Sequence, residues 1–201
     1  MKVSTRWQRT GAPRGDDYDA RWRALAASGE NVHGEGDLVE TLLTESGGRT
    51  VLDAGCGTGR VAIELDRRGF SAAGVDADPA MLAAARAKAP ELTWLHADLA
   101  EVSSLGGALP DRFDLVLLAG NVMIFLEPET EGRVLTNMAA RLVPGGLLVA
   151  GFGLQPDRLS LPRYDDLAAA AGLTPVARWA TWDRQPFDDG DYAVSVHRAD
   201  R

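Results

Sequence analysis

The sequence predicts an α/β fold with a doubly wound, mostly parallel seven-stranded sheet, and three observations predict it. From residue 50 onward, short apolar runs of strand length alternate with helical patterns, which is typical of a parallel sheet covered by helices. The first run leads into a glycine-rich turn at residues 55–59, where such sheets hold ligands. The last two runs, 176–183 and 192–198, are joined by a short connection with proline and glycine, so we expect a C-terminal antiparallel hairpin.

The first 48 residues precede this alternation and have a different pattern. Residues 1–15 are polar and interrupted by glycine and proline, which predicts a loose tail. Apolar residues at spacings of three and four predict one helix over residues 16–28 and a second over residues 37–44. We therefore expect a tail and cap helices over residues 1–48 and the sheet domain over residues 49–201.

The elements of the sheet domain follow from local signals. Residues 113–119 form a continuous apolar run, as in a strand buried on both faces. Asp78 followed by Pro79 is a strong helix start, and Pro144-Gly145-Gly146 predicts a turn before the fifth strand. The predicted strands before the hairpin are 50–54, 71–76, 93–96, 113–119 and 147–152, and the predicted helices are 58–68, 78–89, 127–141 and 164–171.

Composition limits the classes of partner. The chain has 29 acidic and 21 basic residues and a net charge of −8. A negative surface repels nucleic acid unless basic residues cluster, and the basic groups at 21–23 and 67–68 are short. No apolar run approaches the ~18 residues of a membrane span. We therefore expect neither nucleic acid nor a membrane as a partner, and the sequence indicates no oligomeric state.

The only cysteine of the sequence, Cys56, bears on the compartment. One cysteine cannot form an internal disulfide, which favours a reducing compartment. The basic residues near the N-terminus precede no apolar run, unlike those of a secretory signal. Together these observations predict a cytoplasmic location. No Cys/His cluster has the spacing of metal ligands, so we expect no metal.

The glycine loop distinguishes between two kinds of nucleotide ligand. In the dinucleotide fingerprint G-x-G-x-x-G the third glycine would fall on Arg60, whereas residues 55–59 have the spacing G-x-G-x-G. Asp53 precedes the loop, and a carboxylate there repels a pyrophosphate but attracts an ammonium group. Asp76 lies 21 residues after Gly55, where a carboxylate can bind both hydroxyls of a ribose. A ribose and a positive group without phosphate match S-adenosylmethionine, which we expect as the cofactor.

Residues 51–59 resemble motif I of the class I S-adenosylmethionine-dependent methyltransferases, in the form hh-D-x-G-C-G-x-G. Further segments resemble later motifs of this family in the same order, so the resemblance covers roughly residues 50–200. These segments are 74–76 with 79–82, 96–99, 113–116 and 142–146. The resemblance implies a Rossmann-like methyltransferase fold with an S-adenosylmethionine-binding domain over residues 49–201.

The resemblance implies three sets of residues that contact the cofactor. Those near its amino-acid and methyl end are Asp53, which faces the ammonium, and Gly55, Cys56, Gly57 and Ala119. Those near adenosine are Asp76 at the ribose hydroxyls, Ala77 and Met81 at the adenine face, and Asp98 and Leu99 at the adenine amino group. Tyr18, on the first predicted helix, is implied to form part of a lid.

Several of these residues have a second interpretation that stays open. Met81 could be a core residue, and Asp98 could cap a short turn. Cys56 is interpreted as a small apolar side chain of the loop rather than a reactive thiol, because no cationic partner is nearby in the sequence. Tyr18 and Trp22 could pack on the sheet edge instead of covering the cofactor.

Two residues are candidates for a catalytic role. Methyl transfer mainly requires alignment, so a general base is needed only if the acceptor must lose a proton. His33, followed by Gly34 in a glycine-rich connection, is the best candidate base, and a surface-loop histidine is the alternative. Asn121 either orients an acceptor or holds its loop by an Asx turn. The Pro-Pro that follows this position in amino-methyltransferases of nucleic acids and some proteins is missing, which disfavours those substrates.

The sequence thus predicts an S-adenosylmethionine-dependent methyltransferase that acts on an unidentified small molecule. An NAD-dependent oxidoreductase is the alternative enzyme, and both Arg60 in place of the third glycine and the lack of a Tyr-x-x-x-Lys pair speak against it. A catalytically silent cofactor-binding module is a further alternative that nothing in the sequence excludes.

Overall fold

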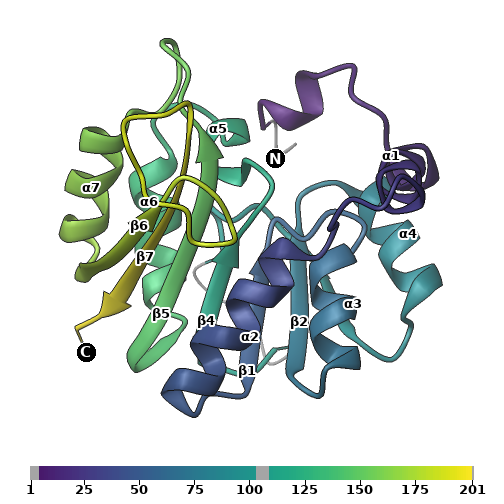
Figure 1. Cartoon of the computed structure of the whole chain (residues 1–201), viewed down its shortest axis with the longest axis horizontal. Coiled ribbons are helices and arrows are strands. Elements are labelled where there is room, and N and C mark those ends of the chain that lie inside the picture. The colour runs from purple at the N-terminus through teal and green to yellow at the C-terminus, as the bar shows by residue number, and fades with distance from the viewer. Residues whose placement is uncertain (1–4, 103–108, 201) are drawn as a thin grey trace.

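The computed structural model describes residues 5–102 and 109–200. Its strands are β1 (Thr50–Ala54), β2 (Ser71–Asp76), β3 (Thr93–His96), β4 (Phe113–Leu118), β5 (Leu142–Gly153), β6 (Leu173–Trp179) and β7 (Tyr192–Ala199). They form one sheet in the order β3-β2-β1-β4-β5-β7-β6 (Figure 1). β1 to β5 pair in parallel, and β7 is antiparallel to both of its neighbours. The predicted doubly wound sheet with an antiparallel C-terminal hairpin is confirmed.

Helices cover both faces of the sheet. They are α1 (Gly15–Ala27), α2 (Gly34–Ser46), α3 (Arg60–Arg67), α4 (Pro79–Lys88), α5 (Val122–Phe125), α6 (Glu131–Ala139) and α7 (Leu161–Ala170), with a 3₁₀ turn η1 (Trp7–Arg9) before them. Side chains alternate along β4: Leu115 and Leu117 share a core cluster with α2 and α3, whereas Val116 and Leu118 share one with α6 and α7. A strand buried on both faces therefore separates two cores, as its continuous apolar run predicts.

The predicted turn at Pro144-Gly145-Gly146 is wrong, because this segment lies inside β5. Gly145 has a φ of +79°, and the register between β4 and β5 shifts between Phe113 and Leu115. Phe113 pairs with Leu142 and Leu115 with Leu147, and such a break in regular pairing accommodates proline and glycine within a strand. The proline followed by two glycines therefore marks an irregularity in the sheet and not a reversal of the chain.

The predicted helix 127–141 is shorter in the structure, where α6 spans Glu131–Ala139. Glu129 has a φ of +69°, which a continuous helix cannot contain. α5, a single turn just after β4, was not predicted. After β4 the chain therefore forms α5 before it enters α6. Val122 of α5 lies against Gly55, so α5 lies beside the glycine loop.

The prediction of a loose N-terminal tail is wrong for the described residues 5–14. η1 is held by two interactions with Asp78: the indole Nε1 of Trp7 donates a hydrogen bond at 3.0 Å, and Arg14 forms an ion pair at 2.6 Å. The guanidinium of Arg14 also lies 4.1 Å from the centroid of the Trp7 ring. In Figure 1 this segment crosses the upper end of the sheet between α1 and α5. Long-range contacts therefore order a stretch whose own sequence favours no regular structure.

The C-terminal hairpin is longer and less regular than predicted. β6 ends at Trp179, so residues 180–191 form the connection, and Trp182 lies outside the strand. Arg178 of β6 is not simply solvated, because its guanidinium pairs with Asp165 of α7 at 2.5 Å and donates to Ser195. Arg178 thereby ties β6 to the helix that packs against it.

Asp114 joins the start of β1 to β4, and we predict that it stabilises the fold. Its Oδ2 accepts hydrogen bonds from the backbone N–H groups of Arg49 and Thr50, at 2.8 and 2.9 Å, and from the Thr50 hydroxyl at 2.8 Å. Burial raises the pKa of Asp114, but these bonds outweigh it and leave the pKa below its usual value. Asp114→Ala should lower the free energy of unfolding in urea by about 2 kcal/mol near neutral pH, because it leaves these donors without a partner.

The effect of Asp114 should depend on pH in one direction. A carboxyl group with a lowered pKa in the folded state stabilises the fold above its unfolded pKa of about 3.9, and this stabilisation is lost as the pH falls through the lower folded value. The difference between Asp114→Ala and the wild-type chain should therefore shrink below about pH 4. Asp111→Ala, which removes an exposed carboxylate close by, is the control. Equal stability of both variants at neutral pH would contradict the assignment.

Within the described ranges, no helix has both the length and the apolar character needed to cross a membrane.

Candidate functional site

The loop after β1 is held in a conformation that only glycine adopts easily. Gly55, Gly57 and Gly59 have φ values of +85°, +56° and +79°. A Cβ atom on Gly55 would lie 2.3 Å from Cγ2 of Val122, so side chains are excluded by position as well as by backbone conformation. The N–H of Gly55 donates to the carbonyl of Val75 in β2 at 2.7 Å. The loop therefore lies tightly between β2 and α5, and its backbone lines a cavity at the ends of the strands.

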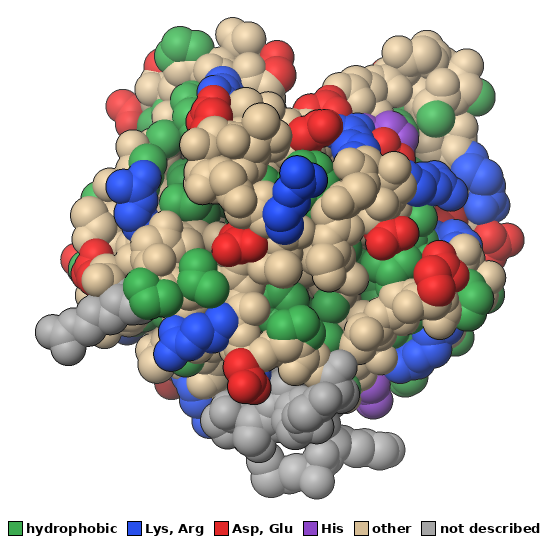
Figure 2. All heavy atoms as spheres, turned by 90° about the horizontal axis from the view of Figure 1, so that it is seen from below, with side chains coloured by type: hydrophobic (Ala, Val, Ile, Leu, Met, Phe, Trp, Pro, Cys, Tyr) green, Lys and Arg blue, Asp and Glu red, His purple; other side chains and the backbone are tan. Residues whose placement is uncertain are grey.

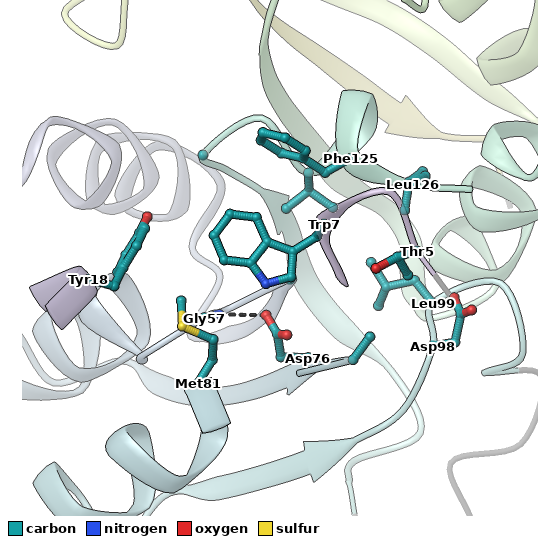
Figure 3. A pocket seen from close by; sticks show the side chains of 14 residues that line it. Thr5, Trp7, Tyr18, Gly57, Asp76, Met81, Asp98, Leu99, Phe125 and Leu126 are labelled. Carbon is teal, nitrogen blue, oxygen red and sulfur yellow. Dashed lines mark hydrogen bonds between the residues drawn. The ribbon is translucent and has the colours of Figure 1, made fainter. Parts of the chain in front are cut away.

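Asp76, the last residue of β2, lies at the centre of this cavity. Its Oδ2 accepts a hydrogen bond from the N–H of Gly57 at 2.7 Å (Figure 3). Its Oδ1 accepts one from the N–H of Asp78 at 2.8 Å. Burial raises the pKa of Asp76, and these backbone bonds oppose that shift. A carboxylate has about four lone-pair sites, so each oxygen can still accept a bond from a hydroxyl group. The cavity can thus bind a vicinal diol such as that of ribose.

The wall beyond Asp76 has the residues expected around an adenine ring. Ala77, Met81, Asp98 and Leu99 line the same cavity. Met81 is buried and accepts a hydrogen bond at its Sδ from the N–H of Gly15, so it is both a core residue and a wall residue. Oδ1 of Asp98 accepts from the N–H of Ala100 at 2.9 Å, as the turn interpretation expects. Its second oxygen is available to the cavity.

The outer wall of the cavity comes from residues that the sequence analysis did not single out. Thr5 and Trp7 line it from the N-terminal segment, and Val122, Phe125 and Leu126 line it from α5 and the residue after it. Figure 3 shows the indole of Trp7 between Asp76 and Phe125, and its ring centroid lies 5.5 Å from that of Phe125. The sequence contained one signal for Trp7: a tryptophan in a polar tail is costly to leave in water, so its ring is expected to pack against the rest of the protein.

A second, smaller cavity adjoins the first on the side of Asp53. It is lined by Tyr18, Asp53, Gly55, Cys56, Gly57, Thr58, Arg60, Val61, Ala119 and Gly120. Burial raises the pKa of Asp53 to about 7, against the attraction of Arg60. Burial also raises the pKa of the Cys56 thiol, so Cys56 is a protonated, small apolar group of the loop at neutral pH.

α1 covers this second cavity because two polar contacts anchor it. Asp19 accepts a hydrogen bond from the hydroxyl of Thr58, in the glycine loop, and pairs with Lys88 of α4, both at 2.5 Å. Tyr18 beside it lines both cavities. Trp22, one turn further along α1, lies against the guanidinium of Arg60, whose carbon is 3.9 Å from the ring centroid. α1 therefore lies over the carboxyl ends of the strands.

The two candidate catalytic residues lie in different places. Asn121 has a φ of +70°, and its Oδ1 accepts a hydrogen bond from the N–H of Gly153 at 2.7 Å. It thereby fixes the loop after β4 to the end of β5, and it also lines a third cavity. His33 is the residue before α2, with its Nδ1 3.9 Å from Glu64. It lines a separate hollow with Trp22 and Arg60, and the structure does not bring it to the two cavities around the glycine loop.

Over residues 5–102 and 109–200, no group of three or more His, Cys, Asp or Glu side chains is arranged to hold a metal ion.

A parallel sheet with a glycine loop after its first strand, and acids at the ends of two adjacent strands, defines the class of nucleotide-cofactor-binding α/β proteins. Comparisons with known proteins define the family. Residues 51–146 match a family model described as a methyltransferase domain. The crystal structure of a TehB-like S-adenosylmethionine-dependent methyltransferase from Corynebacterium glutamicum is 32% identical, with a TM-score of 0.78 over 90% of this chain and 96% of that one.

Two sequence relatives are a glycine/sarcosine N-methyltransferase of Parasynechococcus marenigrum and a trans-aconitate 2-methyltransferase of Methylobacterium nodulans. The first is 33% identical over 67% of this chain and 48% of its own length, and the second is 31% identical over 80% and 58%. This chain thus spans about half the length of these relatives. It belongs to the class I S-adenosylmethionine-dependent methyltransferases, and S-adenosylmethionine is the cofactor.

Proposed function

We propose that this chain transfers the methyl group of S-adenosylmethionine to a small-molecule acceptor. The observation that carries the proposal is the pair of buried carboxylates Asp53 and Asp76, which end adjacent parallel strands on either side of the glycine loop. One suits an ammonium group and the other a ribose. Arg60, which replaces the third glycine of the dinucleotide fingerprint, pairs with Glu35 at 2.6 Å.

Most of the predicted site residues that line the two cavities have a role in this proposal. Asp76 binds the ribose hydroxyls, Ala77 and Met81 lie against adenine, and Asp98 accepts from its amino group. In the second cavity, Asp53 binds the ammonium, and the loop from Gly55 to Gly57, Ala119 and Tyr18 enclose the amino-acid end. The cofactor supplies an activated methyl group, so these residues act by orienting it and by excluding water.

These roles divide the chain into two functional parts. We assign residues 49–201 to cofactor binding and residues 1–48 to a cap. Nucleic acid is not a partner in this proposal: the net charge is −8, and the face in Figure 2 carries acidic and basic side chains interspersed. The single cysteine supports a cytoplasmic location.

Titration calorimetry with S-adenosylhomocysteine and with NAD tests the proposal. Binding of S-adenosylhomocysteine without binding of NAD is expected. Binding of NAD alone would overturn the cofactor assignment and favour an oxidoreductase. Binding of S-adenosylhomocysteine without methylated product in a broad acceptor screen, followed by mass spectrometry, would favour a silent cofactor-binding module.

We also predict that Asp98 contributes to recognition of adenine. Asp98→Ala should weaken binding of S-adenosylhomocysteine by about five- to tenfold, because it removes one hydrogen bond to the adenine amino group. The measurement is the same calorimetric titration. Asp157→Ala, which removes an exposed carboxylate outside both cavities, should leave the affinity unchanged. An unchanged affinity in Asp98→Ala would remove Asp98 from the site.

A further inference from the structure

A third cavity adjoins the cofactor site and has room for an acceptor. It has a volume of about 690 Å³, within the range of about 300–1,000 Å³ that is usual for small-molecule sites. Trp7, Tyr18, Gly120 and Phe125 line both this cavity and the one that contains Asp76. The acceptor and the cofactor would therefore meet at a shared wall. A free amino acid as small as glycine would leave most of this space empty.

Six aromatic side chains from distant parts of the chain line this cavity. They are Trp7, Tyr18, Trp22, Phe125, Trp182 and Tyr192. The indole Nε1 of Trp182 donates to the hydroxyl of Tyr192 at 3.3 Å. A Cβ atom on Gly151 of β5 would lie 2.2 Å from the Trp182 ring and 2.8 Å from that hydroxyl, so the sheet has a glycine where this aromatic pair lies against it.

The aromatic pair contributes no charge. Burial raises the pKa of Tyr192 to about 12, so its hydroxyl is neutral at physiological pH. Trp22 already shows what such a ring attracts, because the Arg60 guanidinium lies against it. Aromatic faces attract cations, and most strongly where water is excluded.

The charged residues of the cavity favour the same kind of ligand. Among the described residues that line it are the carboxylates of Asp17, Glu35 and Asp183, against one cation, Arg21. Glu35 pairs with Arg60, whereas Asp17 and Asp183 form no ion pair among the residues that the structure describes. Hydrogen bonds from Thr181 and Gln185 lower the pKa of Asp183, which keeps it ionised. A carboxylate-bearing acceptor would meet net repulsion here.

We propose that the methyl acceptor is an amine larger than a free amino acid and without a carboxylate of its own. This inference rests on the proposed methyl transfer and names its substrate class. The amine enters as a cation, loses a proton to water, and attacks the methyl carbon with its lone pair. The bond between that carbon and sulfur breaks, and its electron pair stays on sulfur. The products are S-adenosylhomocysteine, the methylated ammonium ion and the released proton.

A matched set of acceptors tests the substrate class. Benzylamine, phenethylamine and tryptamine are each assayed with S-adenosylmethionine beside phenethyl alcohol, phenylacetate and glycine, and methylated products are measured by mass spectrometry. At least one amine should be methylated with a kcat/KM at least about tenfold above that of every alcohol, carboxylate and glycine. Methylation of none of the amines, or an equal rate with an alcohol, a carboxylate or glycine, would overturn the inference.

Substitutions at Trp182 test whether the aromatic wall recognises the amine. Trp182→Leu should raise the KM for the amine by about five- to thirtyfold and leave the affinity for S-adenosylhomocysteine unchanged. Trp179→Leu, at a tryptophan outside the cavity lining, is the matched control and should leave the KM near the wild-type value. Trp182→Phe, which keeps an aromatic face, should have a KM between those of the wild-type chain and Trp182→Leu. An unchanged KM in Trp182→Leu would contradict the proposal.

The carboxylates are tested by their response to salt. The double variant Asp17→Asn/Asp183→Asn should raise the KM about fivefold at low ionic strength, and the difference should fade near 0.5 M salt. Asp188→Asn, an exposed carboxylate of the same connection, is the control. A double variant with an unchanged KM, or with an effect independent of salt, would remove the carboxylates from recognition. These assays also distinguish the inference from the proposed function. If the wild-type chain binds S-adenosylhomocysteine but methylates no amine, only this inference is refuted. If the wild-type chain does not bind S-adenosylhomocysteine, the proposed function is refuted.

Discussion

The Gly55→Ala variant is expected to bind S-adenosylhomocysteine at least about 100-fold more weakly than the wild-type chain. Its Cβ would lie 2.3, 3.0 and 3.3 Å from three carbon atoms of Val122, so the loop or α5 must move. The loop backbone and Val122 both line the cavity that contains Asp76, and a shift of about 1 Å at such a site is enough to cost this much affinity. The affinity is measured by calorimetry and the fold by circular dichroism.

Two further variants separate the steric overlap from backbone strain. Gly172→Ala places alanine at a φ of +75° with no atom within 4 Å, so it should lose about 1 kcal/mol of stability and keep its affinity. The double variant Gly55→Ala/Val122→Ala removes two of the three overlapping carbons and should recover part of the lost affinity. A stably folded Gly55→Ala variant with wild-type affinity would contradict the role of the loop.

The affinity for S-adenosylhomocysteine should rise with pH because of Asp53. Burial raises the pKa of Asp53 to about 7, so about one protein molecule in ten has it ionised at pH 6 and most have it ionised at pH 7.5. The ammonium group of the ligand favours the ionised carboxylate. Affinity should therefore increase about five- to tenfold between these two pH values, and ligand binding below pH 7 should release a proton from Asp53.

Asp53→Asn isolates this effect. The variant should bind S-adenosylhomocysteine at least about tenfold more weakly at pH 7.5, because it lacks the charge that faces the ammonium, and its affinity should change little between pH 6 and 7.5. 5′-Methylthioadenosine, which has no amino-acid end, serves as the control ligand and should bind both proteins with the same weak pH dependence. The same slope in Asp53→Asn as in the wild-type chain would assign the titration to another group.

Much of the proposed cofactor site could be predicted from the sequence because its residues are local to two strand ends. Asp53 lies near the end of one strand, Gly55 follows that strand, and Asp76 ends the next; parallel strands bring their carboxyl ends to the same edge. The structure places Asp76 and Asp53 in adjoining cavities on either side of the loop. His33 shows the limit of this reasoning. A histidine beside glycines suggested a base, yet its position depends on how α2 packs, and that packing directs it toward Glu64.

The sequence by itself determined the sheet, the glycine loop and the kind of cofactor, since strand alternation and the spacing around Gly55 are written in consecutive residues. Only the tertiary structure decided which residues line the third cavity, where we propose that the acceptor binds. Trp7 comes from a stretch with no regular pattern, and Trp182 from a connection beyond β6. They line one cavity with Phe125 because of long-range packing. Asp78 orders the N-terminal segment, and Trp182 packs against Gly151. Contacts between residues so far apart in the sequence cannot be seen in any short stretch of it.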